Sequence, residues 1–168
     1  MERLKHFFKR DHDGDEGFTL IELMVVVLII GILVAIAVPT FLGARKGAQD
    51  KAAESSVRNA LTTAKVYLTN NNDSYTGVTA AALGTLEPAL TFTSAITTAS
   101  SSNDIQVATD TTTGDICLSA YSASGNNFGI VDNPSGTTYY YKSATAAMPC
   151  AGTYTGTGFG ANATAAGW

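Results

Sequence analysis

The sequence is poor in charge and in histidine, and each shortage argues against a class of function. Charged residues make up 14% of the 168 residues and the formal net charge is −4, so no basic surface is available for generic nucleic-acid binding. The two histidines, His6 and His12, both lie close to the start of the chain. The rest of the chain therefore lacks the imidazole that most often serves as a general base, and we expect no enzymatic activity.

Cysteine is also scarce. Cys117 and Cys150 both lie in a polar C-terminal region. If that region leaves the cytoplasm, the two thiols can pair. The bridge would close a loop of about 34 residues, for which the chain-entropy model gives roughly 3 to 4 kcal/mol. The alternative is two unconnected buried thiols.

What the sequence does have is one concentrated apolar segment. Long aliphatic residues crowd into positions 20–42, whereas Thr, Ser, Ala, Gly and Asn dominate after about residue 70. The first sixteen residues are densely charged and contain no apolar core. This order is wrong for an ordinary secretory signal peptide, in which the apolar segment precedes the cleavage site.

The apolar segment predicts a helix that is long enough to span a membrane. Residues 18–44 contain a single ionisable side chain, Glu22, and as a helix they would reach about 40 Å, against roughly 30 Å for the hydrocarbon core of a bilayer. Pro39 and Gly31 weaken this helix, and we expect a kink near residues 35–39. Basic residues flank the segment on both sides, so charge does not fix its orientation.

The helix is expected to continue as an amphipathic segment over residues 45–70. Apolar positions recur there at helical spacing between charged ones, and the run Asn70-Asn71-Asn72-Asp73 favours a turn that ends the helix. We expect the apolar stripe to pack against a separate layer formed by residues 71–168.

Glu22 needs a physical reason, because a carboxylate in a membrane helix costs about 2.5 to 3.5 kcal/mol even on the milder scale. A cut between Gly17 and Phe18 would create an ammonium group four residues before Glu22, on the same helical face. That amine would neutralise the carboxylate within one chain or between staggered neighbours. The alternative is that Glu22 reaches the membrane surface from the helix end.

The C-terminal region predicts a short helix and an antiparallel sheet. Residues 79–86 favour a helix that ends at Pro88, and Gly-containing turns separate several of the alternating segments that follow. The expected strands are 90–96, 105–109, 116–122, 128–131 and 137–142. The fold class is therefore α+β, with a long N-terminal helix packed on an antiparallel sheet head.

Several polar and aromatic patterns in the head indicate no special function. Strand alternation places Tyr140 on one face and its neighbours Tyr139 and Tyr141 on the other, so packing explains all three. Two glycosylation-like triplets, which begin at Asn72 and Asn162, are weak matches. Four aspartates match no calcium-binding loop, and we expect them to be solvated turn residues. These aspartates are Asp104, Asp110, Asp115 and Asp132.

The segment Gly17-Phe18-Thr19-Leu20-Ile21-Glu22-Leu23 resembles the prepilin processing motif of type IV pilins and type II secretion pseudopilins. The likeness covers about 50 residues. It includes a short charged leader, the glycine before the cut, a glutamate fifth in the mature chain, the aliphatic run and Pro39.

The resemblance implies a processing route and an assembly mechanism. A membrane aspartic prepilin peptidase would remove residues 1–17 after Gly17, and Phe18 would become the N-methylated first residue. Glu22 would pair with the amine of Phe18 on an adjacent subunit, while Pro39 and Gly31 would let the helix loosen during assembly. A disulfide commonly ties the last segment of such heads, and Cys117 and Cys150 fit that role.

The resemblance also implies the partners and the location. The protein would be a single-pass precursor in the cytoplasmic membrane and then a subunit of a helical homo-oligomer at the cell surface, with an assembly ATPase and a platform protein as partners. No cofactor and no metal are expected. One alternative is a pseudopilin or minor pilin of a type II secretion or DNA-uptake machine. Another is a plain single-span membrane protein that keeps its N-terminus.

Overall fold

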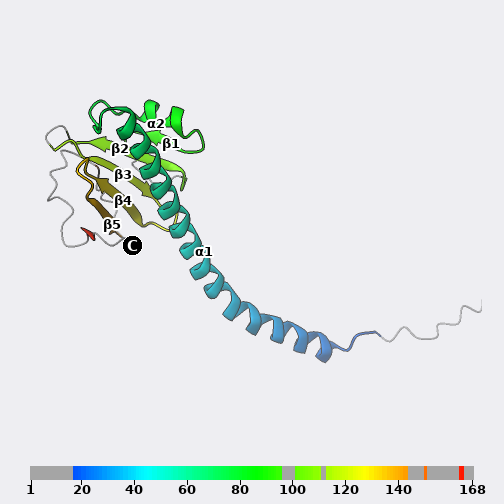
Figure 1. Cartoon of the computed structure of the whole chain (residues 1–168). Helices are drawn as coiled ribbons and strands as arrows, with labels where there is room; N and C mark the ends of the chain where they lie inside the picture. Colours follow the sequence, from blue (N-terminus) through cyan, green and yellow to red (C-terminus); the bar gives the residue numbers. More distant parts are fainter. Residues whose placement is uncertain (1–16, 96–100, 111–112, 144–149, 151–162, 165–168) are drawn as a thin grey trace, which may run out of the picture. The chain divides into compact units, whose positions relative to one another are not determined.

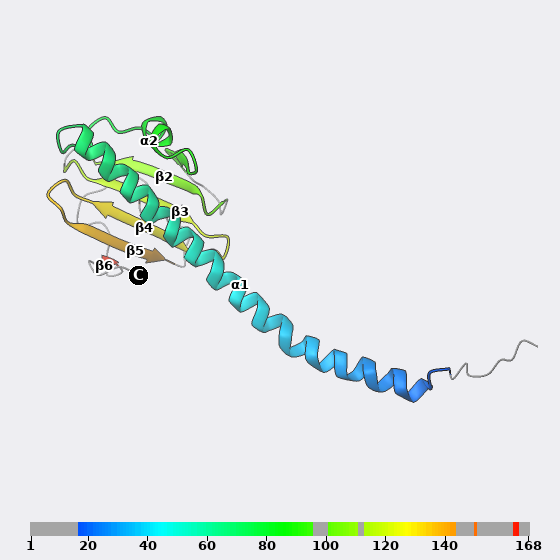
Figure 2. The same ribbon diagram turned by 45° about the vertical axis from the view of Figure 1, so that its right-hand side comes forward.

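The computed structural model describes residues 17–95, 101–110, 113–143, 150 and 163–164. Residues 1–16 of the expected leader, and Asn162 of the second glycosylation-like triplet, lie outside these ranges. The described elements are the helices α1 (Leu20–Asn70) and α2 (Ala80–Leu86) and the strands β1 (Thr91–Thr93), β2 (Asp104–Thr109), β3 (Ile116–Tyr121), β4 (Asn127–Asp132), β5 (Thr138–Ser143) and β6 (Ala163–Thr164), labelled in Figures 1 and 2.

Helix α1 is a single helix of 51 residues that ends where the asparagine-rich run begins to turn. Asn72 and Asp73 have φ angles of 53° and 54°, in the left-handed region that Asn and Asp tolerate better than most residues. The amide of Asp73 donates to the carbonyl of Leu68 at 3.0 Å, which satisfies one of the last carbonyls of the helix. The predicted end of the helix is confirmed.

The chain divides into two compact units, residues 1–41 and residues 42–168, and the boundary falls within α1. In the first unit, α1 continues through Pro39 without a break. The hydroxyl of Thr40 donates to the carbonyl of Ile36 at 2.9 Å, a backbone contact that often accompanies bending. The kink at Pro39 and Gly31 itself stays a prediction.

In the second unit, α1 lies across one face of the sheet, as Figures 1 and 2 both show. The buried stripe consists of Ala53, Val57, Ala60 and Ala64, whose spacing of three and four residues follows one side of a helix. Three of these four are alanines, so the backbone of α1 can approach the strands closely. The stripe packs against Ile105, Leu118, Phe128 and Ile130 of the sheet. The predicted amphipathic second half of α1 is confirmed.

The strands follow the order β1-β2-β3-β4-β5-β6 in one sheet. From β2 to β5 each neighbouring pair is antiparallel, as predicted. The two-residue strand β6, which was not predicted, pairs antiparallel with β5. The expectation of a fully antiparallel meander is wrong at one edge, because β1 pairs with β2 in parallel, with Thr91 opposite Asp104. Side chains alternate between the two faces in the same way whether a strand is parallel or antiparallel to its neighbour, so the sequence pattern did not predict the orientation of β1.

The two faces of the sheet pack against different clusters of side chains, as the tyrosines of β5 show. Tyr140 packs against the main core below α1, whereas Tyr141 packs on the opposite face against Val131 and the two cysteines. Tyr139 is 37% exposed. The predicted alternation of the three tyrosines is confirmed.

Helix α2 is short and is capped by a neighbouring side chain. The hydroxyl of Thr79 accepts a hydrogen bond of 3.1 Å from the amide of Ala82, and Leu83 is fully buried in the main core. The helix ends before Glu87 and Pro88, because proline disfavours the helical conformation in the residue that precedes it.

Candidate functional site

The start of α1 is fixed by a local hydrogen-bond arrangement. The hydroxyl oxygen of Thr19 accepts from the amide of Glu22 at 3.2 Å, and the same hydroxyl lies 3.5 Å from a carboxylate oxygen of Glu22. The pattern Thr-x-x-Glu is a helix-capping signature that supplies a partner for an otherwise unpaired amide. This cap was not predicted from the sequence, although Thr19 and Glu22 stand at the spacing that is typical of it. Its effect is that the helix begins at Leu20 and leaves Gly17 and Phe18 outside it.

The Gly17–Phe18 bond therefore lies in accessible, non-helical chain. Phe18 is 84% exposed, and a Cβ atom added at Gly17 would meet no atom within 4 Å. The fold of this chain does not itself demand glycine at position 17, since the space around it is open. A requirement for glycine there would come from a molecule that binds this segment.

Glu22 lies close to the predicted cut. Gly17, Phe18, Thr19 and Glu22 together line a wide, open hollow of about 540 Å³. The chain described is uncleaved, so Phe18 carries a peptide nitrogen and no ammonium group. The pairing of Glu22 with a terminal amine accordingly stays a prediction.

The helix that follows exposes an apolar surface along the whole of residues 20–42. The large hydrophobic side chains from Phe18 to Leu42 are between 48% and 84% exposed. By length and composition, α1 contains a stretch that can cross a membrane, and none of that stretch is buried within the chain. A surface of this size needs cover from lipid or from other protein chains.

Three aspartates in the head differ from the prediction that they are solvated. Asp110, Asp115 and Asp132 are only 3%, 4% and 1% exposed. They are buried because they accept hydrogen bonds that hold turns and neighbouring elements, such as the 2.6 Å bond from the Asn133 side-chain amide to Asp115. Within the described ranges, no group of three or more His, Cys, Asp or Glu side chains is placed to hold a metal ion.

Asp132 joins four parts of the second unit. One carboxylate oxygen accepts from the hydroxyl of Tyr75 at 2.6 Å, and the other accepts from Thr138 at 2.6 Å and lies 3.4 Å from the ammonium of Lys65. Burial, and then the hydrogen bond to Asp132 and its charge, raise the pKa of Tyr75 above its ordinary value. Tyr75 therefore stays a protonated donor.

A second carboxylate ties α1 to the turn between β3 and β4. Asp50 accepts hydrogen bonds from the hydroxyl of Ser124 and, at 2.8 Å, from the side-chain amide of Asn126. Burial alone would raise the pKa of Asp50. The hydrogen bonds from Ser124, Ser122 and Asn126, together with the charge of Lys142, outweigh burial and hold this pKa below its ordinary value.

Cys117 and Cys150 form a disulfide, with their Cα atoms 5.5 Å apart and 33 positions apart in the sequence. Both cysteines are buried on the face of the sheet that lies away from α1, beside Val131 and Tyr141. Because Cys117 lies in β3, the bridge attaches the chain beyond β5 to the middle of the sheet.

The chain is similar to known proteins both in its N-terminal segment and over most of its length. Residues 14–38 match the model of the prokaryotic N-terminal methylation motif, which includes Gly17, Phe18 and Glu22. The type IV wide pilus major component PilA4 of Thermus thermophilus is 32% identical over 139 residues, which cover 83% of this chain and 86% of that protein. The type IV major pilin protein PilA of Myxococcus xanthus is 42% identical over 66 residues, which cover 39% of this chain and 30% of that protein. No solved structure matches the chain.

Proposed function

The chain belongs to the type IV pilin family, and from that premise we propose that it is a structural subunit of a type IV pilus. It is anchored in the membrane as a precursor and assembles with copies of itself into a surface filament. The observation that carries this proposal is the uncovered apolar surface of residues 20–42, which directly follows the methylation motif. A filament supplies that cover when the helices leave the lipid.

Processing takes place at the bond between Gly17 and Phe18. A prepilin peptidase removes residues 1–17, and the new amino terminus at Phe18 is methylated. Two features of the chain support this site: the bond precedes the first turn of α1, and the space around Gly17 is open enough for a second protein to contact it.

Assembly is directed by the new amine and by Glu22. A lone carboxylate within an apolar helix bundle is costly, and an ammonium group compensates it only when two helices meet at the correct stagger. Glu22 is the single ionisable side chain of residues 18–44, so it selects one register between neighbouring subunits. The pairing of Phe18 and Glu22 therefore mainly determines the register in which neighbouring subunits dock.

The precursor crosses the cytoplasmic membrane once, through residues 18–44. Pro39 weakens the backbone hydrogen bonding there, because it cannot donate to the carbonyl four residues earlier, and Gly31 lowers the helix propensity. We propose that this part of the helix loosens as the subunit leaves the bilayer. An assembly ATPase and a platform protein supply the work of extraction.

The test combines shearing, electron microscopy and mass spectrometry. Cells that produce the chain are sheared, filaments are imaged in the supernatant, and the intact mass of the main protein band is measured. The proposal expects this chain as the dominant band, without residues 1–17 and with one added methyl group. A filament fraction that lacks the chain, or a chain that keeps its first seventeen residues, would overturn it.

A further inference from the structure

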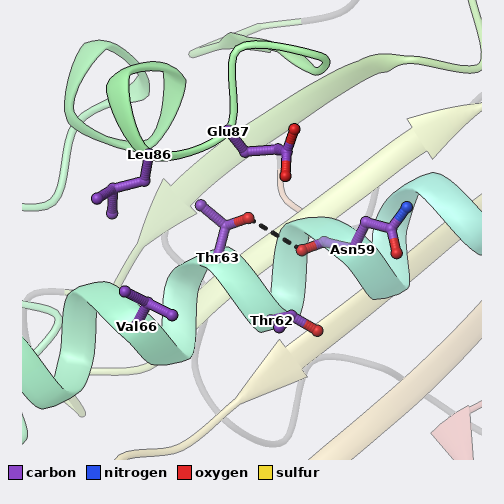
Figure 3. Close-up of a pocket in the computed structure, with 6 residues that line it drawn as sticks. All are labelled: Asn59, Thr62, Thr63, Val66, Leu86 and Glu87. Atoms are coloured by element: carbon purple, nitrogen blue, oxygen red, sulfur yellow. Dashed lines mark hydrogen bonds between the residues drawn. The ribbon is translucent and has the colours of Figure 1, made fainter.

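A groove lies between the second half of α1 and the C-terminal end of α2. It has a volume of about 380 Å³ and is open to solvent. Figure 3 shows its lining, in which Val66 and Leu86 lie toward one end and Asn59 and Glu87 toward the other. Thr62 and Thr63 lie between them, and the hydroxyl of Thr63 is held by the carbonyl of Asn59 at 3.1 Å. The groove thus has an apolar end and an acidic end.

The apolar end is unusual for this head. After residue 42, the large hydrophobic side chains that are exposed in the described ranges are Val66 at 47%, Leu86 at 44% and Tyr139 at 37%. Two of these three line the same groove. Single exposed apolar residues need no explanation, but two that meet in one concave site point to a ligand surface.

The acidic end is formed by the carboxylate of Glu87, which can accept further hydrogen bonds. One oxygen of Glu87 accepts a hydrogen bond of 3.3 Å from the amide of Ala89. No ion pair involves Glu87 within the ranges that the structure describes. A ligand for this groove therefore combines an apolar side chain with a nearby cation.

The chain itself carries a segment with this combination. Leu42 is 50% exposed, and Arg45 and Lys46 follow it at the spacings of three and four residues that place side chains on one face of a helix. Both cations are exposed, and neither forms an ion pair in the described part of the chain. After Lys65 the sequence contains one further cation, Lys142, which faces the ring of Phe128.

We propose that the groove of one subunit binds the segment of α1 around Leu42, Arg45 and Lys46 of a second copy. Leu42 packs between Val66 and Leu86. Arg45 and Lys46 follow Leu42 along the helix, but long helical side chains lean toward the N-terminus of their helix, so in a parallel copy the two cations reach back toward Glu87. This proposal rests on the proposed filament and names one contact between its subunits.

The geometry of the contact favours a fibre. The segment and the groove are separated by about 20 residues along α1, which is roughly 30 Å of helix. Two parallel copies must therefore be shifted by about that distance, and each subunit then offers a groove to one neighbour and a segment to another. Such a head-to-tail contact does not close on itself and propagates along a filament.

The test is a charge exchange in cells that assemble filaments from the unmodified chain. Glu87→Arg is expected to reduce sheared filaments several-fold, and so is the pair Arg45→Glu with Lys46→Glu. Combining all three substitutions restores attraction between groove and segment, and filaments are expected to return. Filaments at the normal level with Glu87→Arg, or no recovery in the triple variant, would overturn the proposal.

A matched pair of milder substitutions controls for the loss of an acidic group. Glu87→Gln removes the charge in the groove, whereas Asp73→Asn removes a charge from the exposed turn after α1. We expect fewer filaments from Glu87→Gln than from Asp73→Asn, with equal amounts of processed subunit in the membrane. Equal filament yields from the two variants would contradict the proposal. Failure of the proposed function is distinguishable, since the unmodified chain would then form no filaments at all.

Discussion

The hydroxyl of Tyr75 donates a hydrogen bond of 2.6 Å to Asp132, a carboxylate that is 1% exposed. This bond links the turn region after α1 to the end of β4. Thr138 of β5 and Lys65 of α1 approach the other oxygen of the same carboxylate. One buried acid therefore holds the end of α1 and the turn after it against the β4–β5 hairpin, which lies 57 positions beyond Tyr75 in the sequence.

We expect Tyr75→Phe to destabilise the head. The substitution removes a donor from a buried carboxylate, which typically costs about 1 to 3 kcal/mol in the free energy of unfolding. Tyr139→Phe is the matched control, because Tyr139 is 37% exposed and makes no comparable bond in the described structure. Urea unfolding of the full chain in detergent measures the difference. Equal unfolding midpoints for the two variants would show that the buried bond contributes little.

The Asp50 contact predicts a specific dependence on pH. The pKa of Asp50 in the folded chain lies below the ordinary 3.8, so the folded state favours the charged form. This contribution is fully present above the unfolded pKa and is lost as the pH falls through the lower folded pKa. Asp50→Asn should therefore lower the stability at neutral pH and weaken its acid dependence below about pH 4.

The same unfolding measurement, repeated from neutral to acid pH, reads out that dependence. Asn126→Ala is the matched variant, because it keeps the carboxylate and removes one of its donors. We expect Asn126→Ala to give an intermediate acid dependence. An Asp50→Asn curve that runs parallel to that of the unmodified chain at every pH would contradict the assigned role.

Reduction of the disulfide should lower the free energy of unfolding by roughly 3 to 4 kcal/mol, the amount that the chain-entropy model gives for a loop of this length. The double variant Cys117→Ala with Cys150→Ala is the control. Its unfolding midpoint should be low and should not respond to reductant. If reductant leaves the unmodified chain at its original midpoint, the bridge does not stabilise the head.

Replacement of Gly17 should block processing without disturbing the fold. A Cβ atom added at residue 17 would meet no atom within 4 Å, so Gly17→Leu is expected to keep the fold and to accumulate as full-length precursor. Gly31→Ala is the control, because the space around Gly31 is equally open while the residue lies inside α1. The intact mass of the protein in the membrane fraction shows whether residues 1–17 have been removed. Continued cleavage at the same bond in Gly17→Leu would refute the assigned site.

Glu22→Gln should separate insertion from assembly. The variant keeps the size of the side chain, so we expect membrane insertion and processing to continue while filaments in the sheared fraction fall sharply. The reason is that an uncharged residue no longer favours the register in which the amine of a neighbouring Phe18 is compensated. Asp73→Asn, which removes a charge far from the apolar segment, should leave filament yield unchanged. Normal filament yield from Glu22→Gln would exclude the pairing.

Much of the architecture was predictable from the sequence, because the strongest signals are long and periodic. The apolar run, the amphipathic repeat through Val57 and Ala64, and the stop at Asn70 together fix α1. The strands β1 to β5 were predicted within a few residues, since turns such as those at Gly125 and Gly136 separate them, whereas the two-residue strand β6 was not predicted. The processing motif was visible because glycine, phenylalanine and glutamate stand at fixed spacing before and within an aliphatic segment.

What the sequence did not reveal depends on contacts between distant residues. Asp110, Asp115 and Asp132 look like ordinary turn residues, and only their partners in the fold explain why they are buried. The parallel direction of β1 depends on how the chain returns before β2. The groove at Val66 and Leu86 was likewise hidden, because neither residue stands out until α1 and α2 are placed together.

The bridge between Cys117 and Cys150 also decides how the head bears mechanical load. Once β6 has separated from β5, a pull on the chain beyond Cys150 reaches β3, which is flanked by β2 and β4, before it reaches the end of β5. Tension then acts on an interior strand that two ladders of hydrogen bonds hold, whereas a strand at the edge of the sheet is held by one. With the bridge reduced, the same pull would unzip the sheet from its last strand at a lower force.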